Sequence, residues 1–266
     1  MPAVRTPAVA GMFYPDDPRQ LAQDVQRFLH GAQPRTLNPK ALICPHAGYV
    51  YSGAIAASAY AALKDVAPRI RRVVLLGPTH RVAIRGLALP DADAFDTPLG
   101  RIGLDTDAMH ALASLPQITV SHEAHRLEHS LEVQLPFLQS VLKDFTLLPL
   151  AVGMATAEEV AEVLESVWGG DETLIVVSSD LSHYLSYAAA QAVDHETVRD
   201  ILDLQQPIAH DHACGATPIN GLILAARRHR LKPQLLDLRN SGDTAGSNLK
   251  VVGYASIAFT HGDEHD

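Results

Sequence analysis

Three histidines in this 266-residue chain stand a few residues beyond short apolar runs that are typical of buried strands. They are His46, His80 and His183, and each lies close to glycine, proline or aspartate residues that favour turns. A single histidine after a strand is more often a structural turn residue. Three with the same placement favour a site, because ligands of open α/β sheets bind outside the carboxyl ends of the strands. Since neutral imidazole commonly binds iron, copper and zinc, the pattern predicts a metal-binding crevice.

Two histidines would give a metal ion two bonds, so a further ligand is needed. Cys214 precedes a predicted helix, whose dipole is expected to lower the pKa of the thiol and favour the thiolate. An ordinary buried thiol fits the same position equally well. Cys44 lies in an apolar, strand-like setting and is interpreted as structural. The candidates for the third ligand are Cys214, Asp180, His183 and the Glu128–His129 pair.

Two carboxylates stand close to histidines in the sequence. Asp180 precedes His183 by three residues, a spacing that suits an aspartate orienting a histidine or an acid–base pair. A helix cap at Asp180 is the alternative. His129 follows Glu128 directly and could shuttle protons, whereas Glu132 is interpreted as part of a capping box.

Alternating strands and helices must position these residues. The alternation predicts an α/β fold with a layered, largely parallel (mixed) sheet flanked by helices, in one domain over residues 1–266. Residues 1–15 are expected to form an extended arm packed on it, and residues 95–104 a hairpin insertion. Pro136 predicts a kink or a late start in the helix that contains it. The predicted strands are 41–43, 73–76, 86–89, 145–150, 174–177, 235–238 and 250–259, and the predicted helices are 16–29, 52–63, 105–114, 129–142, 157–167, 188–204 and 216–229.

Composition excludes several classes of protein. The net charge of −9 argues against a nucleic-acid surface, which would be basic. No apolar run approaches the roughly 18 residues of a membrane span, and the start of the chain lacks a secretory signal, so a cytoplasmic protein without membrane contact is expected. Two cysteines exclude a disulfide framework but allow one bridge. The sequence lacks a phosphate loop, a Rossmann fingerprint and a G-x-S-x-G elbow.

Five short motifs in order resemble the Memo family, whose bacterial and archaeal members are called AmmeMemoRadiSam system protein B. The resemblance covers about residues 8–258. The motifs are Pro45–Gly53, Leu76–His80, Glu128–Pro136, Ser178–His183 and Cys214–Ile219. The resemblance implies a fold like the catalytic subunit of class III extradiol dioxygenases. Carried over to this chain, it implies a metal pocket with His46, His80 and Cys214 as ligands, lined by Asp180 and His183, with His129 nearby.

The resemblance and the residues together predict a metal-dependent redox enzyme. Iron(II) is the first expectation for the metal, and copper or zinc are alternatives. His183, held by Asp180, would act as general base, and His129 as a proton donor or substrate anchor. A small molecule or peptide would occupy the pocket, and the family name implies radical-SAM and AMMECR-type partner proteins. Two other functions fit the sequence, a non-catalytic metal- or peptide-binding module and a zinc hydrolase using metal-bound water.

Overall fold

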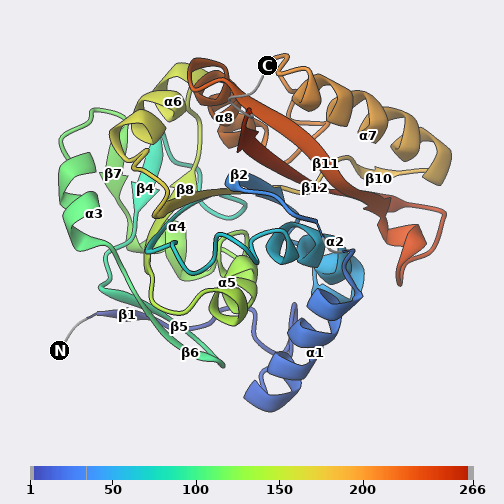
Figure 1. Ribbon diagram of the computed structural model, residues 1–266, viewed down its shortest axis with the longest axis horizontal. Coiled ribbons are helices and arrows are strands. Elements are labelled where there is room, and N and C mark those ends of the chain that lie inside the picture. The colour runs from blue at the N-terminus through green and yellow to red at the C-terminus, as the bar shows by residue number, and fades with distance from the viewer. Residues whose placement is uncertain (1–2, 34, 263–266) are drawn as a thin grey trace.

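The computed structural model describes residues 3–33 and 35–262, and a nine-stranded mixed sheet forms its centre (Figure 1). The strands are ordered β10–β12–β2–β9–β3–β8–β4–β7, with β11 also paired to β12. They are β2 (Pro39–Cys44), β3 (Arg72–Pro78), β4 (Leu87–Leu89), β7 (Ile118–Val120), β8 (Thr146–Val152), β9 (Thr173–Ser178), β10 (His183–Leu185), β11 (Leu231–Asn240) and β12 (Val251–His261). The four strands β2, β9, β3 and β8 run parallel, whereas β12 and β4 pair antiparallel with β2 and β8. The predicted layered, largely parallel fold is confirmed.

Both faces of the central strands are buried. In β2, Leu42 and Cys44 belong to the apolar cluster on one face, and Ala41 and Ile43 to the cluster on the other. Parallel strands covered on both faces are apolar at every position rather than at every second one. This is why the central strands stand out in the sequence as continuous apolar runs.

Helices cover the two faces of the sheet. Figure 1 shows α1 (Pro18–Gly31), α2 (Tyr49–Ala61) and α5 (Leu135–Val141) below the sheet, and α6 (Ala157–Ser166), α7 (Tyr187–Leu202) and α8 (Ala216–Arg228) above it. The two apolar clusters contain residues of these two sets of helices, respectively. The shorter helices are α3 (Thr106–Leu112), α4 (His122–Arg126) and the 3₁₀ turns Glu132–Gln134 and Ser241–Asp243.

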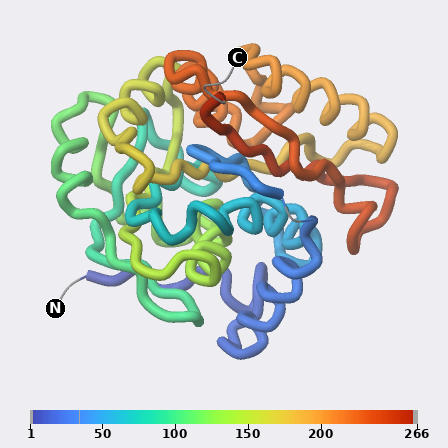
Figure 2. Tube along the Cα trace, viewed as in Figure 1, coloured from blue at the N-terminus to red at the C-terminus, as the bar shows by residue number. Residues whose placement is uncertain are grey.

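The N-terminal arm pairs with the predicted hairpin. The hairpin of β5 (Ala94–Thr97) and β6 (Gly100–Gly103) forms as expected, and β1 (Val4–Arg5) adds to β5 in parallel. Figure 2 shows the blue start of the chain lying beside this green hairpin. Val9 and Tyr14, further along the arm, are buried in the core. Residues 1 and 2 of the predicted arm lie outside the described residues.

The structure departs from the predicted elements between residues 116 and 142 and near His183. The short elements β7 and α4 were not predicted, and neither was β10 near His183. The helix predicted from residue 129 starts late, because α5 begins at Leu135 with Pro136 in its first turn, where a missing N–H breaks no hydrogen bond. The capping role predicted for Glu132 is wrong. Its carboxylate is fully buried and accepts a hydrogen bond from Arg5 instead.

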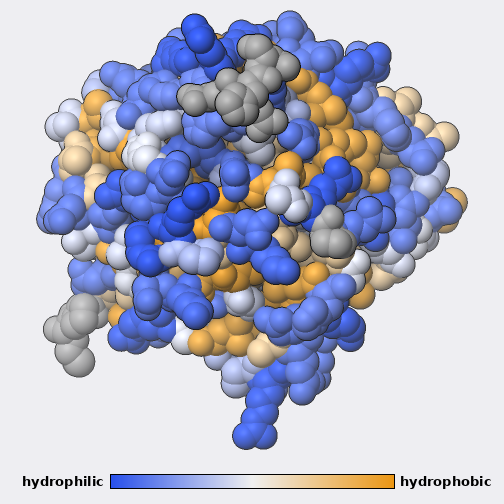
Figure 3. All heavy atoms as spheres, viewed as in Figure 1, coloured by the Kyte–Doolittle hydropathy of each residue, from blue (hydrophilic) through white to orange (hydrophobic). Residues whose placement is uncertain are grey.

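The face shown in Figure 3 is mostly hydrophilic, with apolar residues visible between the charged side chains. Within residues 3–33 and 35–262, the helices are too short or too polar to cross a membrane. Cys44 is buried in the core, as its structural interpretation predicted, and both Cys44 and Cys214 are free thiols.

Candidate metal centre

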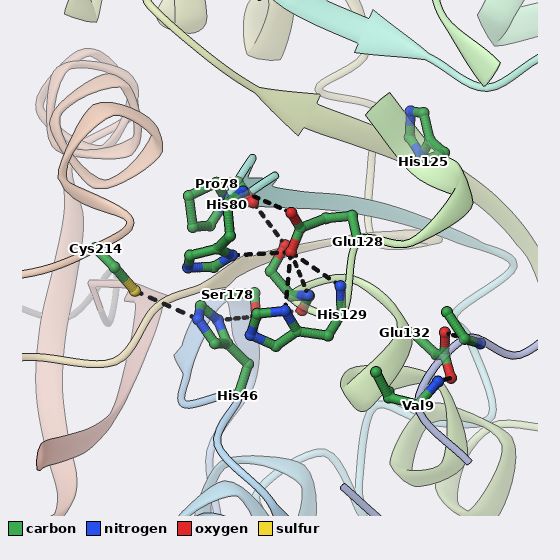
Figure 4. Close-up of polar contacts among 12 residues, drawn as sticks. Val9, His46, Pro78, His80, His125, Glu128, His129, Glu132, Ser178 and Cys214 are labelled. Atoms are coloured by element: carbon green, nitrogen blue, oxygen red, sulfur yellow. Dashed lines mark hydrogen bonds and ion pairs between the residues drawn. The ribbon is translucent and has the colours of Figure 1, made fainter. Parts of the chain in front are cut away.

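Two of the predicted histidines meet a third one at the carboxyl edge of the sheet. His46 follows β2 and His80 follows β3, and both strands are parallel neighbours of β9. His129 comes from the loop between α4 and the Glu132–Gln134 turn. The three rings converge in Figure 4, and one ligand atom from each lies within 4.8 Å of the other two. The structure therefore contains a candidate three-histidine metal site.

The ring of His46 is held by one hydroxyl group whose other hydrogen bonds fix the ring's tautomer. Ser178 Oγ donates to the Ser130 carbonyl at 2.6 Å and accepts from Gln134 Nε2 at 2.7 Å. Because the single hydroxyl proton is already used, His46 Nδ1, 2.9 Å away, must be the donor in its contact with Ser178. His46 Nε2 then carries the lone pair that a metal ion needs.

The Glu128 carboxylate fixes the ring of His80 in the same way. Its Oε1 lies 2.9 Å from His80 Nδ1, and its other oxygen accepts from the His80 backbone N–H at 2.6 Å. Burial alone would raise the pKa of Glu128, but the hydrogen bonds from His80 and from the Ser130 backbone outweigh it and lower this pKa to about 2. An ionised carboxylate can only accept, so His80 carries its proton on Nδ1 and leaves Nε2 free.

His129 completes the arrangement. Its Nδ1 lies 3.3 Å from the same Glu128 oxygen, and its ring stacks on the His80 ring with centroids 4.5 Å apart. The His46 ring stands nearly perpendicular to the other two, with centroids at 5.2 Å from His80 and 5.4 Å from His129. His46 and His80 thus have their Nδ1 atoms in hydrogen bonds, which leaves their Nε2 atoms as metal donors, and the His129 ring completes the cluster.

Burial keeps His46 and His129 neutral. The pKa of His46 is held well below its ordinary value, first by burial and then by the neighbouring histidines. Burial also lowers the pKa of His129 to about 4. Neutral imidazole is the form that binds metals, so at neutral pH these rings are ready to act as ligands without first losing a proton. The donor set fits a transition-metal ion.

Cys214 lies beside His46, but the pKa of its thiol differs from the prediction. Its Sγ is 3.3 Å from His46 Nε2, and Figure 4 shows it pointing at that ring from the loop before α8. The expected lowering of the thiol pKa by the helix dipole is wrong. Burial, followed by the charge of Asp180, raises the pKa of Cys214 to about 12. The thiol is therefore protonated in the metal-free protein, and coordination would require loss of that proton.

Asp180 and His183 lie in the same cleft, but the structure does not pair them as predicted. Asp180 Oδ1 accepts a hydrogen bond from the His46 backbone N–H at 2.7 Å, so it shapes the turn that carries His46. Among the described residues, no hydrogen bond joins this carboxylate to the ring of His183. Burial raises the pKa of Asp180 to about 7 and lowers that of His183. The catalytic roles of both residues stay predictions.

A cleft of about 640 Å³ opens over the cluster. It is lined by the three histidines together with Asp180 and His183. Four aromatic side chains and one lysine supply much of its remaining wall, and these are Phe13, Tyr51, Tyr184, Tyr254 and Lys250. The cleft can therefore hold an organic molecule against the candidate metal centre. Cys214 lies at the margin of a smaller cavity of about 250 Å³.

Sequence reasoning missed the residues that orient the histidines. Ser178 ends β9 and Gln134 precedes α5, and neither stands near His46 in the chain. Glu128 was paired in sequence with His129, yet it also binds His80, 48 residues away. A polar residue at the end of an apolar strand is the only local signal for Ser178, and such residues are common.

Comparison with known proteins assigns the chain to a family. The model of the Memo-like proteins matches residues 5–258, nearly the whole chain. The chain belongs to the Memo family. A MEMO1 family protein of Methanosarcina barkeri is 36% identical over an alignment of 271 positions, which covers 96% of this chain and 99% of that protein. A MEMO1 family protein of Aquifex aeolicus is 35% identical, again over 96% and 99% of the two chains.

Membership in the Memo family confirms the resemblance read from the five motifs. A solved structure of an uncharacterized Escherichia coli protein, JW3007, is also similar, with a TM-score of 0.53 and 16% identity over 82% of this chain and 98% of that one. At that identity the similarity shows the shared fold alone.

Proposed function

We propose that this Memo family protein is a metal-dependent oxidoreductase that acts on a small molecule or peptide in the cleft. Iron(II) is the proposed metal, with copper as the alternative, and the proposed ligands are His46, His80 and Cys214. The observation that carries the proposal is the orientation of the two rings. Hydrogen bonds to Ser178 and Glu128 leave both Nε2 atoms as metal donors, and the Cys214 sulfur lies 3.3 Å from the Nε2 atom of His46. Imidazole and thiolate donors together suit redox-active transition metals.

The metal, when bound, would supply a redox-active Lewis acid with open coordination positions. The chain's own residues bind and orient the substrate. His183 lines the cleft and stays neutral because burial lowers its pKa, so its ring accepts a proton from a substrate group as general base. His129 anchors the substrate by accepting a hydrogen bond through Nε2. The aromatic side chains of Tyr51 and Tyr254 line the cleft and provide apolar contacts for the substrate.

Metal analysis of anaerobically purified protein tests the ligand set. Wild type is expected to hold one metal ion per chain, and His46→Ala and Cys214→Ala to lose it. His183→Ala should keep the metal but lose turnover. If Cys214→Ala keeps its metal while His129→Ala loses it, the third ligand is His129. Unchanged metal content in His46→Ala would contradict the proposed metal centre as a whole.

Turnover is tested separately by oxygen uptake in the iron-loaded protein with a panel of catechol-like and other small substrates. Uptake that depends on both iron and His183 supports the oxidoreductase. Its absence with every substrate, in protein that retains stoichiometric iron, contradicts it. The radical-SAM and AMMECR-type partners implied by the family name stay predictions, and co-purification with such proteins would test them.

A zinc hydrolase is the second candidate, favoured by the three-histidine cluster itself. His46, His80 and His129 would hold the zinc ion, which would supply an activated water molecule for hydrolysis. Stoichiometric zinc that survives mild chelation, together with hydrolytic turnover and no oxygen uptake, would favour this function over the first.

A further inference from the structure

The N-terminal arm inserts a charged side chain beneath the loop that carries His129. Arg5 is only 6% exposed, although it lies five residues from the start of the chain. Its Nε donates to the His125 carbonyl at 2.8 Å and its Nη2 to the Glu128 carbonyl at 2.7 Å. Its Nη1 donates to Glu132 Oε2 at 2.7 Å. One guanidinium thus binds three points of residues 125–132, called here the clamp segment.

Glu132 of the clamp segment binds further groups of the arm besides Arg5. Its carboxylate is fully buried and accepts from the backbone N–H groups of Ala8 and Val9 at 2.8 and 3.0 Å. It also accepts from the Tyr14 hydroxyl at 2.5 Å. Four groups of the arm, spread from Arg5 to Tyr14, therefore converge on this single carboxylate. Hydrogen bonds, most of them buried, thus join the arm to the clamp segment at several points.

The clamp segment positions two of the three histidines. Its Glu128 binds the ring and the backbone of His80, and its His129 belongs to the cluster itself. The arm also contacts the cluster directly, because the Phe13 ring lies against the His129 ring with centroids 4.8 Å apart. The Phe13 carbonyl accepts from the Tyr49 N–H at 2.7 Å, in the first turn of the helix that follows His46. The arm therefore touches the segments that hold all three rings.

We propose that the arm is a positioning element of the candidate metal centre, with Arg5 and Glu132 as its positioning residues. The proposal rests on the metal binding proposed above. Arg5 fixes the Glu128 backbone, Glu128 fixes the Nδ1 proton of His80, and the affinity for metal depends on both. Groups that orient metal-binding histidines typically contribute 10- to 100-fold to metal affinity. Docking of the arm and binding of metal are thermodynamically linked. If the docked arm raises the metal affinity by a given factor, bound metal must stabilise docking of the arm by the same factor.

A purely structural role explains these contacts less well. A buried ion pair is weak evidence for stability, because an apolar pair of similar volume often stabilises a protein as well or better. The Arg5–Glu132 pair instead makes directional contacts to particular carbonyl and amide groups of the clamp segment and the arm. Such contacts fix geometry, which metal coordination requires.

Cobalt(II) titration of the full chain tests the proposal, with the visible spectrum of the bound ion as the readout. Arg5→Met keeps the aliphatic stem and removes the guanidinium, and the double variant Arg5→Met/Glu132→Leu avoids leaving a buried charge unpaired. Arg101→Met, which breaks an exposed ion pair with Asp96 in the neighbouring hairpin, is the matched control. The two Arg5 variants are expected to bind cobalt 10- to 100-fold more weakly than wild type. The control should stay within about twofold, the scatter of such titrations.

The hydrogen-exchange rate of residues 3–14 in the wild-type protein is a second measurement. If the arm had a purely structural role, cobalt would not change this rate. Saturating cobalt is expected to slow exchange in the arm by a factor comparable to the affinity loss. A folded double variant that binds cobalt as tightly as wild type, or an arm whose exchange ignores cobalt, would overturn the proposal and leave the metal site standing. Failure of wild type to bind cobalt would remove the metal site and this inference together.

Discussion

Ser178→Ala tests how the ring of His46 is held. The substitution removes the hydroxyl that accepts from His46 Nδ1 and from Gln134 Nε2 and donates to the Ser130 carbonyl. Gln134 keeps its bond to the Pro45 carbonyl, so the two groups left without partners are His46 Nδ1–H and the Ser130 carbonyl. Each buried polar group without a partner costs about 1 to 3 kcal/mol, so the free energy of unfolding should fall by about 2 to 6 kcal/mol.

The same change should also weaken metal binding. Without Ser178 Oγ the ring of His46 is free to carry its proton on Nε2, which removes the lone pair from the metal side. Loss of an orienting partner predicts a 10- to 100-fold weaker metal affinity. Urea unfolding of the metal-free protein gives the first quantity, and cobalt titration of the folded variant gives the second.

Ser182→Ala is the matched control, because Ser182 is as deeply buried as Ser178 and its Oγ makes no hydrogen bond within the described residues. Its removal should change stability by less than about 1 kcal/mol, since no hydrogen bond is lost. If Ser178→Ala matched the control in both measurements, the hydroxyl would not set the tautomer of His46, and the argument for a preformed Nε2 donor would fail.

Three further predictions concern stability away from the site. Burial lowers the pKa of His125 from 6.5 to about 4, so the unfolded chain takes up the proton first as the pH falls. Stability is then full above pH 6.5 and declines toward pH 4, by about 3 kcal/mol for this residue. His125→Gln, which can still donate to the Ala88 carbonyl, should flatten that part of the pH profile in urea unfolding, and an unchanged slope would contradict the assignment. Lys40 donates through Nζ to three carbonyls at 2.6 to 2.9 Å between the end of α6 and the start of β9. Lys40→Met should therefore lower the unfolding free energy by about 2 to 4 kcal/mol, and a neutral result would mean that water replaces the ammonium group. Gly86 has φ +78°, and a Cβ there would meet the Gln117 carbonyl oxygen. Gly86→Ala should therefore lower the thermal midpoint of unfolding by several degrees, and an unchanged midpoint would show that the loop can move aside.

Sequence alone predicted the parts of this protein whose signals are local. The central strands are buried on both faces, so β2, β3, β8 and β9 appear as apolar runs, and the histidines at the ends of β2 and β3 could be placed at one edge of the sheet. The parallel order of the strands then brings His46 and His80 together. Chain order and hydrophobicity were sufficient for this much.

The residues that complete the site come from long-range contacts and could not be predicted in the same way. Glu132 lies three residues after His129, which favours a capping box in sequence, yet its partner is Arg5, 127 residues away. Asp180 lies near His183 in the chain but binds the backbone of His46, 134 residues away. Spacing in the sequence predicts only the hydrogen bonds that a polar side chain could make to its near neighbours. The partner that it has in the folded protein comes from a distant segment that packs against it.

The different partners of His46 and His80 follow from the charges around them. His80 is partly exposed and faces the Glu128 carboxylate, which stays ionised because several N–H groups donate to it. His46 is fully buried, and Asp180 already lies against its backbone. A second carboxylate at His46 Nδ1 would put two like charges close together in a poorly solvated site, where their repulsion is strong. A serine hydroxyl whose proton is committed to the Ser130 carbonyl fixes the same tautomer without adding charge, so one cluster directs both Nε2 atoms toward a metal ion by two different means.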